Sequence, residues 1–325
     1  MISLNEIGRV GSGLNRPECV LTTANGRIYT ADWRGGVAVT ERDGSSWCLL
    51  SDEPGLDIRP NGICLMPDRG FLIAHLGDTD GGIYHIAEDG HTTAFCTEVD
   101  GVSLPPSNYV HLDQKGRIWV TVSTRHIPRS LGYSRSVRDG FVVLIDDGLA
   151  RIVADHLGYT NECLVHPDGT RLFVNETFAR QLVSFDIAEN GDLFNKTVVM
   201  EFGHGTYPDG MTFDEIGGIW ITSIVSNRVI RIAPDGKSEV FLEDCHHEHL
   251  DWVEEAFQTG QMGRPHLDNA RSQKLKNISS LAFGGPDLST GYLGCLLDDC
   301  IYTFESPVKG YAPVHWNFEG PRRHG

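Results

Sequence analysis

The sequence predicts an all-β fold, a six-bladed β-propeller, and three observations lead to this prediction. A short phrase recurs six times along the 325 residues, at spacings mostly in the forties and fifties. In each copy, β-branched and aromatic runs are separated by turns of Gly, Asp, Asn and Pro, as in β-hairpins. The 37 glycines suit many tight turns better than long helices. Such repeats close into a ring, so we expect a single domain over residues 1–325.

Each repeat has the same order of runs and turns. A polar residue precedes a short apolar run, a turn of D-x-x-G type follows, and two further apolar runs complete the block. The blocks start, in chain order, at Arg16, Arg59, Pro106, Tyr159, Tyr207 and Asn277. This order predicts four antiparallel strands per blade, with the polar residue at the head of the innermost strand.

Two long stretches interrupt the repeats. Residues 246–276 lie between the fifth and sixth blocks and contain apolar residues at helical spacing, so we expect a helical insertion there. The residues with this spacing are Leu250, Val253, Ala256 and Phe257. Residues 123–139 lengthen a connection within the third block. Because the strands of a blade alternate in direction, both connections return to the end of the channel where the inner strands begin. Both insertions are therefore expected on that face.

The polar residues of the six blocks form a set that should surround the channel axis. They are Glu18, Asn61, Asn108, Asn161, Asp209 and Ser279. Taken singly, Asn or Asp ahead of a strand often makes an Asx turn, which is the alternative explanation. That explanation gives no use for Glu18, a poor turn former, or for six polar residues in register. Two unpaired carboxylates near one axis need a cation, and oxygen ligands fit Ca²⁺ or Mg²⁺ best, with Mn²⁺ or Zn²⁺ also compatible.

Charge and composition restrict the partners and the compartment. A net charge of −17 repels phosphate backbones and anionic lipid, so we expect no nucleic-acid and no membrane partner. The first residues, M-I-S-L-N-E-I-G-R-V, lack the basic and apolar parts of a signal peptide, and the eight cysteines lack C-x-x-C pairs. We therefore expect a cytoplasmic protein with reduced thiols. The composition is compatible with a homo-oligomer.

Several segments resemble the family of gluconolactonase, senescence-marker protein (regucalcin) and luciferin-regenerating enzyme. They are R-P-E at 16–18, S-N-Y-V-H-L-D-Q-K-G-R-I-W at 107–119, T-N-E-C-L-V-H-P-D-G-T-R-L-F-V at 160–174, Y-P-D-G-M-T-F-D at 207–214 and L-A-F-G-G-P-D-L at 281–288. The resemblance implies a six-bladed propeller with one divalent metal at the channel mouth. By position, it implies that Glu18, Asn161 and Asp209 are the metal ligands, that Asn108 faces the substrate, and that Asp209 is the general base. Asn61, another amide of the set, is a further candidate for substrate contact.

Two positions depart from the sugar-lactone hydrolases that the sequence resembles. Those enzymes usually carry an arginine two residues before the position of Asn108 and an aspartate directly after it. This chain has Pro106 and Tyr109 at these positions. The positions that the resemblance implies as metal ligands are therefore retained while the sugar-contacting ones are not, so a lactone or ester less polar than gluconolactone is an alternative substrate.

The insertion 123–139 is basic in an otherwise acidic chain. Its basic residues are Arg125, His126, Arg129, Arg135 and Arg138. We expect most of them to be solvated, with Arg125 or His126 as the alternative candidate to hold a substrate carboxylate or oxyanion. The motif C-H-H-E-H at 245–249 lacks the H-E-x-x-H spacing of zinc sites, so we expect it only to begin the second insertion. D-T-D-G-G at 78–82 lacks the rest of a calcium loop and is expected to be a turn.

These observations together predict a divalent-metal-dependent lactonase. The cation would stabilise negative charge on the lactone carbonyl oxygen, while Asp209 takes a proton from water and returns it to the leaving alkoxide. No serine nucleophile is signalled, because G-x-S-x-G is absent. Two alternatives stay open. One is a non-catalytic binding propeller, and the other is a different reaction on the same metal site, of arylesterase, phosphotriesterase or lyase type.

Overall fold

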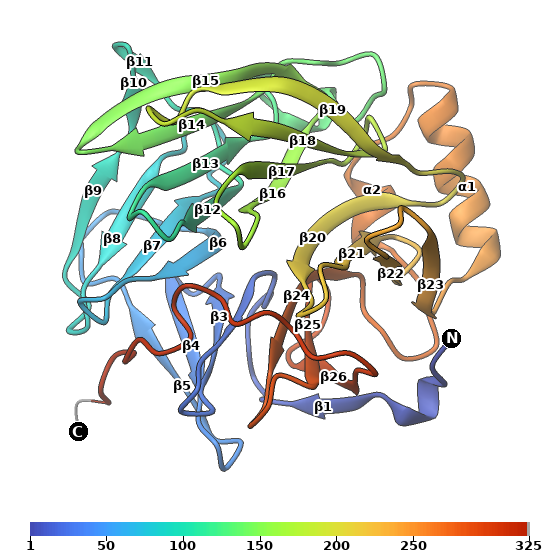
Figure 1. Cartoon of the computed structure of the whole chain (residues 1–325), viewed down its shortest axis with the longest axis horizontal. Coiled ribbons are helices and arrows are strands. Elements are labelled where there is room, and N and C mark those ends of the chain that lie inside the picture. Colours follow the sequence, from blue (N-terminus) through green and yellow to red (C-terminus); the bar gives the residue numbers. More distant parts are fainter. Residues whose placement is uncertain (324–325) are drawn as a thin grey trace.

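The computed structural model, which describes residues 1–323, contains six four-stranded antiparallel sheets arranged in a ring (Figure 1). Blade one contains β2 (Val20–Thr22), β3 (Ile28–Asp32), β4 (Gly36–Thr40) and β5 (Ser46–Leu50). Blade two contains β6 (Pro60–Leu65), β7 (Phe71–His75), β8 (Ile83–Ile86) and β9 (Thr92–Cys96). Blade three contains β12 (Tyr109–Leu112), β13 (Ile118–Val122), β14 (Gly140–Asp146) and β15 (Leu149–Leu157). Blade four contains β16 (Thr160–Val165), β17 (Arg171–Glu176), β18 (Gln181–Ile187) and β19 (Leu193–Glu201). Blade five contains β20 (Tyr207–Phe213), β21 (Ile219–Ile224), β22 (Arg228–Ile232) and β23 (Ser238–Glu243). The predicted six-bladed propeller is confirmed.

The sixth blade joins the two ends of the chain. It contains β24 (Ile278–Gly284), β25 (Thr290–Cys295), β26 (Ile301–Glu305) and, as its outermost strand, β1 (Gly8–Val10). β1 pairs antiparallel with β26, with Gly8 opposite Thr303. The ring is therefore closed by hydrogen bonds between the first and the last strands. A short helix, η1 (Leu4–Glu6), precedes β1, and a small hairpin of β10 (Glu98–Val99) and β11 (Val102–Ser103) lies between blades two and three.

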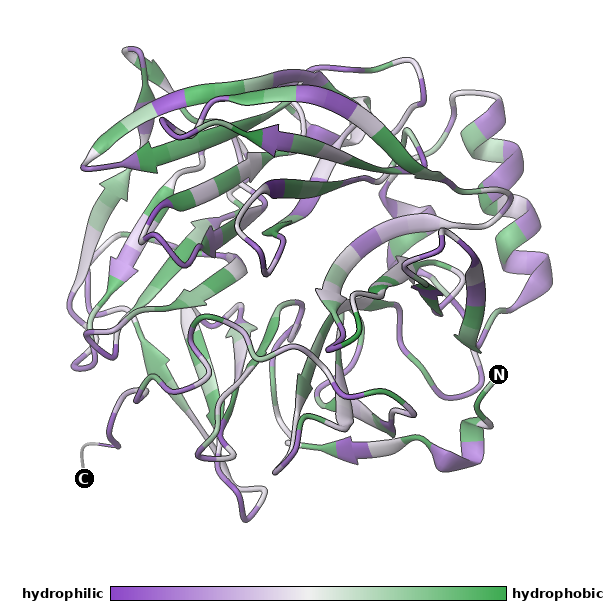
Figure 2. Ribbon diagram, viewed as in Figure 1, coloured by the Kyte–Doolittle hydropathy of each residue, from purple (hydrophilic) through white to green (hydrophobic). Residues whose placement is uncertain are grey.

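The position of a strand in its blade decides its burial pattern. All five residues of β7 and all six of β21 are buried, because neighbouring blades cover both faces of the middle strands. The outermost strands β15 and β19 are mostly exposed or half-buried. Figure 2 shows the same division, with hydrophobic residues along the inner and middle strands and hydrophilic residues at many of the turns. No helix among residues 1–323 is long and apolar enough to cross a bilayer.

Part of the recurring phrase stabilises the first hairpin of a blade. Asp113 accepts hydrogen bonds from the backbone of Arg117 at 3.0 Å and from the Trp119 indole at 3.0 Å, and it pairs with the Arg117 guanidinium at 2.7 Å. Asp214 accepts in the same way from the Trp220 indole, at 2.9 Å. These carboxylates lie at the end of the inner strand that is opposite the ring residues. Their role in the repeat is therefore structural.

The predicted helical insertion is also confirmed. After β23, the chain forms α1 (His247–Gln258) and α2 (Arg264–Asp268), on the right in Figure 1. The four residues with helical spacing lie on the buried face of α1, as expected. His246, from the C-H-H-E-H motif, is the N-cap of α1 and accepts a hydrogen bond from the backbone of His249, at 3.3 Å. The other insertion, residues 123–139, contains only one short helix, η2 (Arg129–Gly132).

Candidate active site at the channel mouth

The heads of the six inner strands meet at one end of the central channel, which we call the mouth. All six polar residues of the repeats, the ring residues, line the same small cavity there. Each is buried, and the most exposed of them, Glu18, retains only 8% of its accessible surface. No ring Asn or Asp accepts a hydrogen bond from its own strand among residues 1–323, so the Asx-turn explanation is not realised in the structure.

β-Bulges aim the ring residues at the channel axis. In β6, β16, β20 and β24 the strand register shifts at the ring residue: between Pro60 and Ile63 in β6, for example, and between Pro208 and Met211 in β20. A bulge places two residues opposite one on the partner strand and turns a side chain away from its regular direction. In a strand without a bulge, successive side chains point alternately to opposite faces of the blade, so the ring residue would not point into the mouth in each of these blades.

The backbone of the ring is fixed by polar groups from neighbouring blades. Thr121 of β13 donates its hydroxyl to the carbonyl of Asn161, at 2.7 Å, and Asn175 of β17 donates its amide to the carbonyl of Asp209, at 2.9 Å. The Ser279 hydroxyl donates to the carbonyl of Glu18, at 2.8 Å, and so joins the sixth blade to the first. These bonds hold the mouth in one geometry before any ligand binds.

Three ring side chains are already engaged within the protein. Glu18 forms an ion pair with Arg16, whose guanidinium also lies 4.2 Å from the ring centre of Trp33. Asn61 donates to the carbonyl of Asn108, at 3.0 Å, and accepts from Arg16, at 3.2 Å. Ser279 is engaged by its bond across the blade boundary. Both the nitrogen and the oxygen of the Asn61 amide therefore already have a protein partner.

The other three ring side chains present oxygen atoms that lack partners. The Asp209 carboxylate makes no hydrogen bond and no ion pair among residues 1–323, although only 4% of the residue is exposed. Burial, together with the charges of Glu18 and Glu162, raises the pKa of Asp209 well above its ordinary value. The Asn108 side-chain oxygen is buried without a partner. Asn161 donates its amide N–H to the Thr177 hydroxyl at 3.2 Å, and nothing in residues 1–323 donates to its oxygen.

This donor set fits a hard divalent cation. Buried carboxylates that face one another are unfavourable unless a cation or protons compensate their charge. Glu18, Asn161 and Asp209 offer oxygen atoms only, and oxygen is the ligand type that Ca²⁺ and Mg²⁺ prefer. Arg16 now neutralises Glu18, so a cation would compete with this guanidinium for the carboxylate.

Glu162 is a third carboxylate at the mouth, and sequence reasoning missed it. It lines the ring cavity, is 5% exposed, and accepts a hydrogen bond from the backbone of Met211 at 3.0 Å. Burial, reinforced by the charge of Glu18, raises the pKa of Glu162 to about 8. Regular alternation would direct the residue after Asn161 away from the channel, but the bulge in β16 turns both residues inward. A pair of adjacent polar residues at a strand head is the only signal that could have pointed to it.

Both insertions contribute to a second cavity directly above the ring. We call residues 123–139 and 246–276 the roof. Arg129 and Tyr133 from the first insertion and Arg264 and Leu267 from the second line this cavity together with ring residues. An aromatic cluster holds the roof on the blades: the Tyr133 ring centre lies 4.7 Å from that of Phe178.

A buried network fastens the helical part of the roof. Glu254 of α1 accepts a hydrogen bond from the backbone of Gly205 at 2.7 Å and forms an ion pair with Arg180. The same guanidinium donates to the Tyr207 hydroxyl, at 2.6 Å. Because these buried hydrogen bonds and the ion pair join α1 to residues of blades four and five, they anchor the helix there.

The structure does not bring Arg125 and His126 to the mouth. The Arg125 guanidinium makes two hydrogen bonds to the Asp155 carboxylate, at 2.8 and 2.9 Å, and lies 4.3 Å from the ring centre of Phe141. His126 is exposed and lies 3.8 Å from Asp139. Both are held beside the outer part of blade three, and the arginine of this insertion that lines the mouth is Arg129. The pattern of charges in the insertion could not separate these arginines, because contacts outside the insertion decide their directions.

Known proteins similar to this chain were found by sequence and by structure. The sequence profile of the SMP-30/Gluconolactonase/LRE-like region matches residues 18–241. A 6-deoxy-6-sulfogluconolactonase of Pseudomonas putida is 27% identical over 218 residues, which cover 65% of this chain and 68% of that protein. A gluconolactonase of Xanthomonas campestris has a TM-score of 0.68 at 17% identity, covering 93% of this chain and 89% of the other. Regucalcin of Agrobacterium tumefaciens, described as a calcium-binding protein, has a TM-score of 0.66 at 17% identity, covering 97% of both chains.

Proposed function

The chain belongs to the SMP-30/gluconolactonase/LRE-like family, and we propose on this basis that it is a lactonase that hydrolyses a cyclic ester at the channel mouth. A sequence relative and a structural neighbour are named as lactonases, which supports the proposal. The observation that carries it is Asp209, a buried carboxylate without a partner among residues 1–323, at the point where the six inner strands meet. A scaffold that binds no cation has no need for such a group, whereas hydrolysis needs a base.

Asp209 would act as the general base. It would accept a proton from the attacking water as oxygen adds to the lactone carbonyl carbon, and it would return that proton to the ring oxygen when the ester C–O bond breaks. Asn108, whose buried side-chain oxygen lacks a partner, would accept a hydrogen bond from the substrate or from this water. The rigid ring and the roof would exclude other water from the site.

Glu18, Asn161 and Asp209 would hold one divalent cation, which when bound would polarise the lactone carbonyl as a Lewis acid. Oxygen ligands favour Ca²⁺ as the first cation to test, and the calcium-binding description of the Agrobacterium neighbour supports this order. Mg²⁺, Mn²⁺ and Zn²⁺ are the next cations to test.

The test is a hydrolysis screen combined with a direct measurement of cation binding. We expect the purified protein to open at least one of γ-valerolactone, gluconolactone and dihydrocoumarin, measured by proton release, and to lose this activity in a chelator until Ca²⁺ is returned. Calorimetry should show one Ca²⁺ site per chain in the wild type and a weaker site in Asn161→Ala. Binding of Ca²⁺ without hydrolysis of any lactone would favour the binding propeller. Turnover of aryl esters or phosphotriesters alone would favour the other reaction types.

A further inference from the structure

The Arg129 guanidinium has no ion-pair partner in the described chain, although the charges of Glu18 and Asp209 act on it from a distance. It begins η2, is half-buried, and lines the cavity above the ring. Its side chain makes no hydrogen bond and no ion pair with any of residues 1–323. Other arginines near the mouth do have carboxylate partners: Arg16 pairs with Glu18, and Arg180 pairs with Glu254. Placing a guanidinium at a partly desolvated site without a partner is unfavourable unless a ligand supplies the negative charge.

A second arginine reaches the same cavity from the other insertion. Arg264, the first residue of α2, lines the cavity with Arg129. It pairs with the exposed carboxylate of Asp268 and lies 3.5 Å from the Tyr133 hydroxyl. Two segments far apart in the sequence therefore place guanidinium groups over one space.

The surroundings of Tyr133 show the electrostatic effect of this arrangement. Burial would raise the pKa of the Tyr133 phenol, but the nearby charges of Arg129 and Arg264 outweigh burial and lower the pKa below its ordinary value. The same aromatic cluster that anchors the roof also holds this phenol in place: its ring centre lies 4.7 Å from that of Phe178 and 5.4 Å from that of Tyr159. The phenol on which both guanidinium groups act is thus held in one place by aromatic packing.

We propose that Arg129 and Arg264 bind an anionic substituent of the substrate, a carboxylate, sulfonate or phosphate, while the ester group is held at the ring below. This rests on the proposed lactonase function and narrows the substrate to an anionic lactone. Arg16 is not part of the anion site, because it is largely buried together with its partner Glu18, whereas the Asp268 carboxylate that pairs with Arg264 is exposed to water. Planar guanidinium groups bind carboxylate, sulfonate and phosphate oxygens through charge-assisted hydrogen bonds, which are stronger than bonds between neutral groups.

The experiment compares matched substrates that differ only in charge. The lactones are γ-butyrolactones that carry a terminal carboxylate or the isosteric carboxamide, attached directly or through one to three methylene groups to vary the reach. We expect the wild type to prefer the best carboxylate by about 10- to 100-fold in kcat/KM, the range for losing a hydrogen bond to a charged group. Arg129→Gln should lose most of this preference through KM, and Arg129→Lys should recover part of it.

Arg125→Gln is the control, because Arg125 lies in the same insertion but pairs with Asp155 outside the mouth. It should keep the wild-type preference. The proposal is overturned if Arg129→Gln keeps the preference as well. It is also overturned if this variant loses activity equally on charged and neutral lactones, which would mean that Arg129 only balances Asp209.

Binding measurements separate this proposal from the lactonase assignment. Pyroglutamate and pyroglutamide are lactams with the same charge difference, and neither is expected to be hydrolysed. If the wild type opens no lactone but binds pyroglutamate at least about 10-fold more tightly than pyroglutamide, and Arg129→Gln does not, the anion site stands and the lactonase function fails. If the wild type binds pyroglutamate and pyroglutamide equally and also treats the charged and neutral lactones alike, the anion site is wrong, even if lactones are hydrolysed.

Discussion

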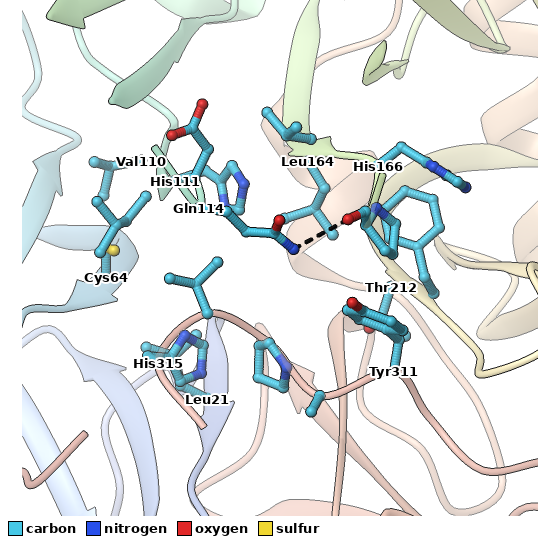
Figure 3. Close-up of a pocket in the computed structure, with 18 of the residues that line it drawn as sticks. Leu21, Cys64, Val110, His111, Gln114, Leu164, His166, Thr212, Tyr311 and His315 are labelled. Carbon is cyan, nitrogen blue, oxygen red and sulfur yellow. Dashed lines mark hydrogen bonds between the residues drawn. The ribbon is translucent and has the colours of Figure 1, made fainter. Parts of the chain in front are cut away.

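The two ends of the central channel are built from the same strands but differ in chemistry. At the mouth, buried carboxylates and amides face one another under the roof. The far end is a mostly apolar pocket, lined by residues such as Leu21, Val110 and Leu164 and crossed by the C-terminal segment with Tyr311 and His315 (Figure 3). The blade architecture cannot account for this contrast, since each inner strand contributes to both ends. The residue types at the strand heads make the mouth a candidate site.

Burial has opposite consequences at the two ends. Burial lowers the pKa of His111 and of His315 to about 4, so both imidazoles at the far end are neutral and need no counter-charge. At the mouth, burial raises the pKa of Asp209, and a carboxylate can stay ionised there only beside a positive charge. The far end therefore needs no ion to balance its charge, whereas the mouth is poised for a cation. Four substitutions test this comparison.

The largest effect is expected from Asp209→Asn at the mouth. An amide keeps an oxygen for a cation but cannot accept the proton of water, so turnover should fall by about 10²–10⁴ while cation binding persists. The measurement is kcat as a function of Ca²⁺ concentration, with calorimetry for binding. If excess Ca²⁺ restores Asp209→Asn to nearly wild-type turnover, Asp209 is only a ligand, and Glu162 is the next carboxylate to test as the base.

Asn161→Ala and Glu18→Gln should show the reverse behaviour. Asn161→Ala removes a ligand oxygen and Glu18→Gln removes the charge that Glu18 contributes, while the proposed base stays in both variants. Ca²⁺ affinity should therefore weaken by at least about 10-fold, and high Ca²⁺ should partly restore turnover. Ser279→Ala is the matched control, because its hydroxyl is used by the Glu18 carbonyl. Equal losses of affinity in all three variants would show that the mouth responds to any change in packing and not to loss of a ligand.

The smallest effect on activity, and a distinct effect on stability, is expected at the far end. Unfolded histidine titrates near its ordinary pKa, about 6.5, so it binds protons at a higher pH than the folded His111 does. Stability should therefore fall as the pH drops from about 6.5 to 4, by at most about 3 kcal/mol for this group. His111→Gln should flatten that part of the curve, measured by urea unfolding at several pH values.

The activity of His111→Gln is compared with that of the wild type as kcat/KM on the best lactone at neutral pH. We expect less than about a two-fold change, because substitutions remote from a site seldom disturb it. A large loss of activity with normal stability would show that the two ends are coupled through β12. The division of the channel into a reactive and a structural end would then be wrong.

The fold and the ring could be predicted from the sequence because both depend on register. Six copies of a phrase define six equivalent positions. Asp209 stands out because the residue type at this position differs between the copies and is an aspartate only in the fifth. Glu162 could not be found in this way, since the bulge that turns it inward is a departure from strand alternation. The sequence could not single out Arg129 among the basic residues of its insertion for another reason: Asp155, on a different strand, determines where Arg125 points.

The closure of the sixth blade has a consequence for how this protein is made. β1 is synthesised before all the other strands of the propeller, yet its partner β26 (Ile301–Glu305) is synthesised after all of them. At about 5–20 residues per second, β1 waits on the order of tens of seconds without its neighbour. During translation the blades can form one after another from local hairpins. The bond that joins Ser279 to Glu18 can form only after the inner strand of the sixth blade has been synthesised, so the mouth cannot be completed before that point.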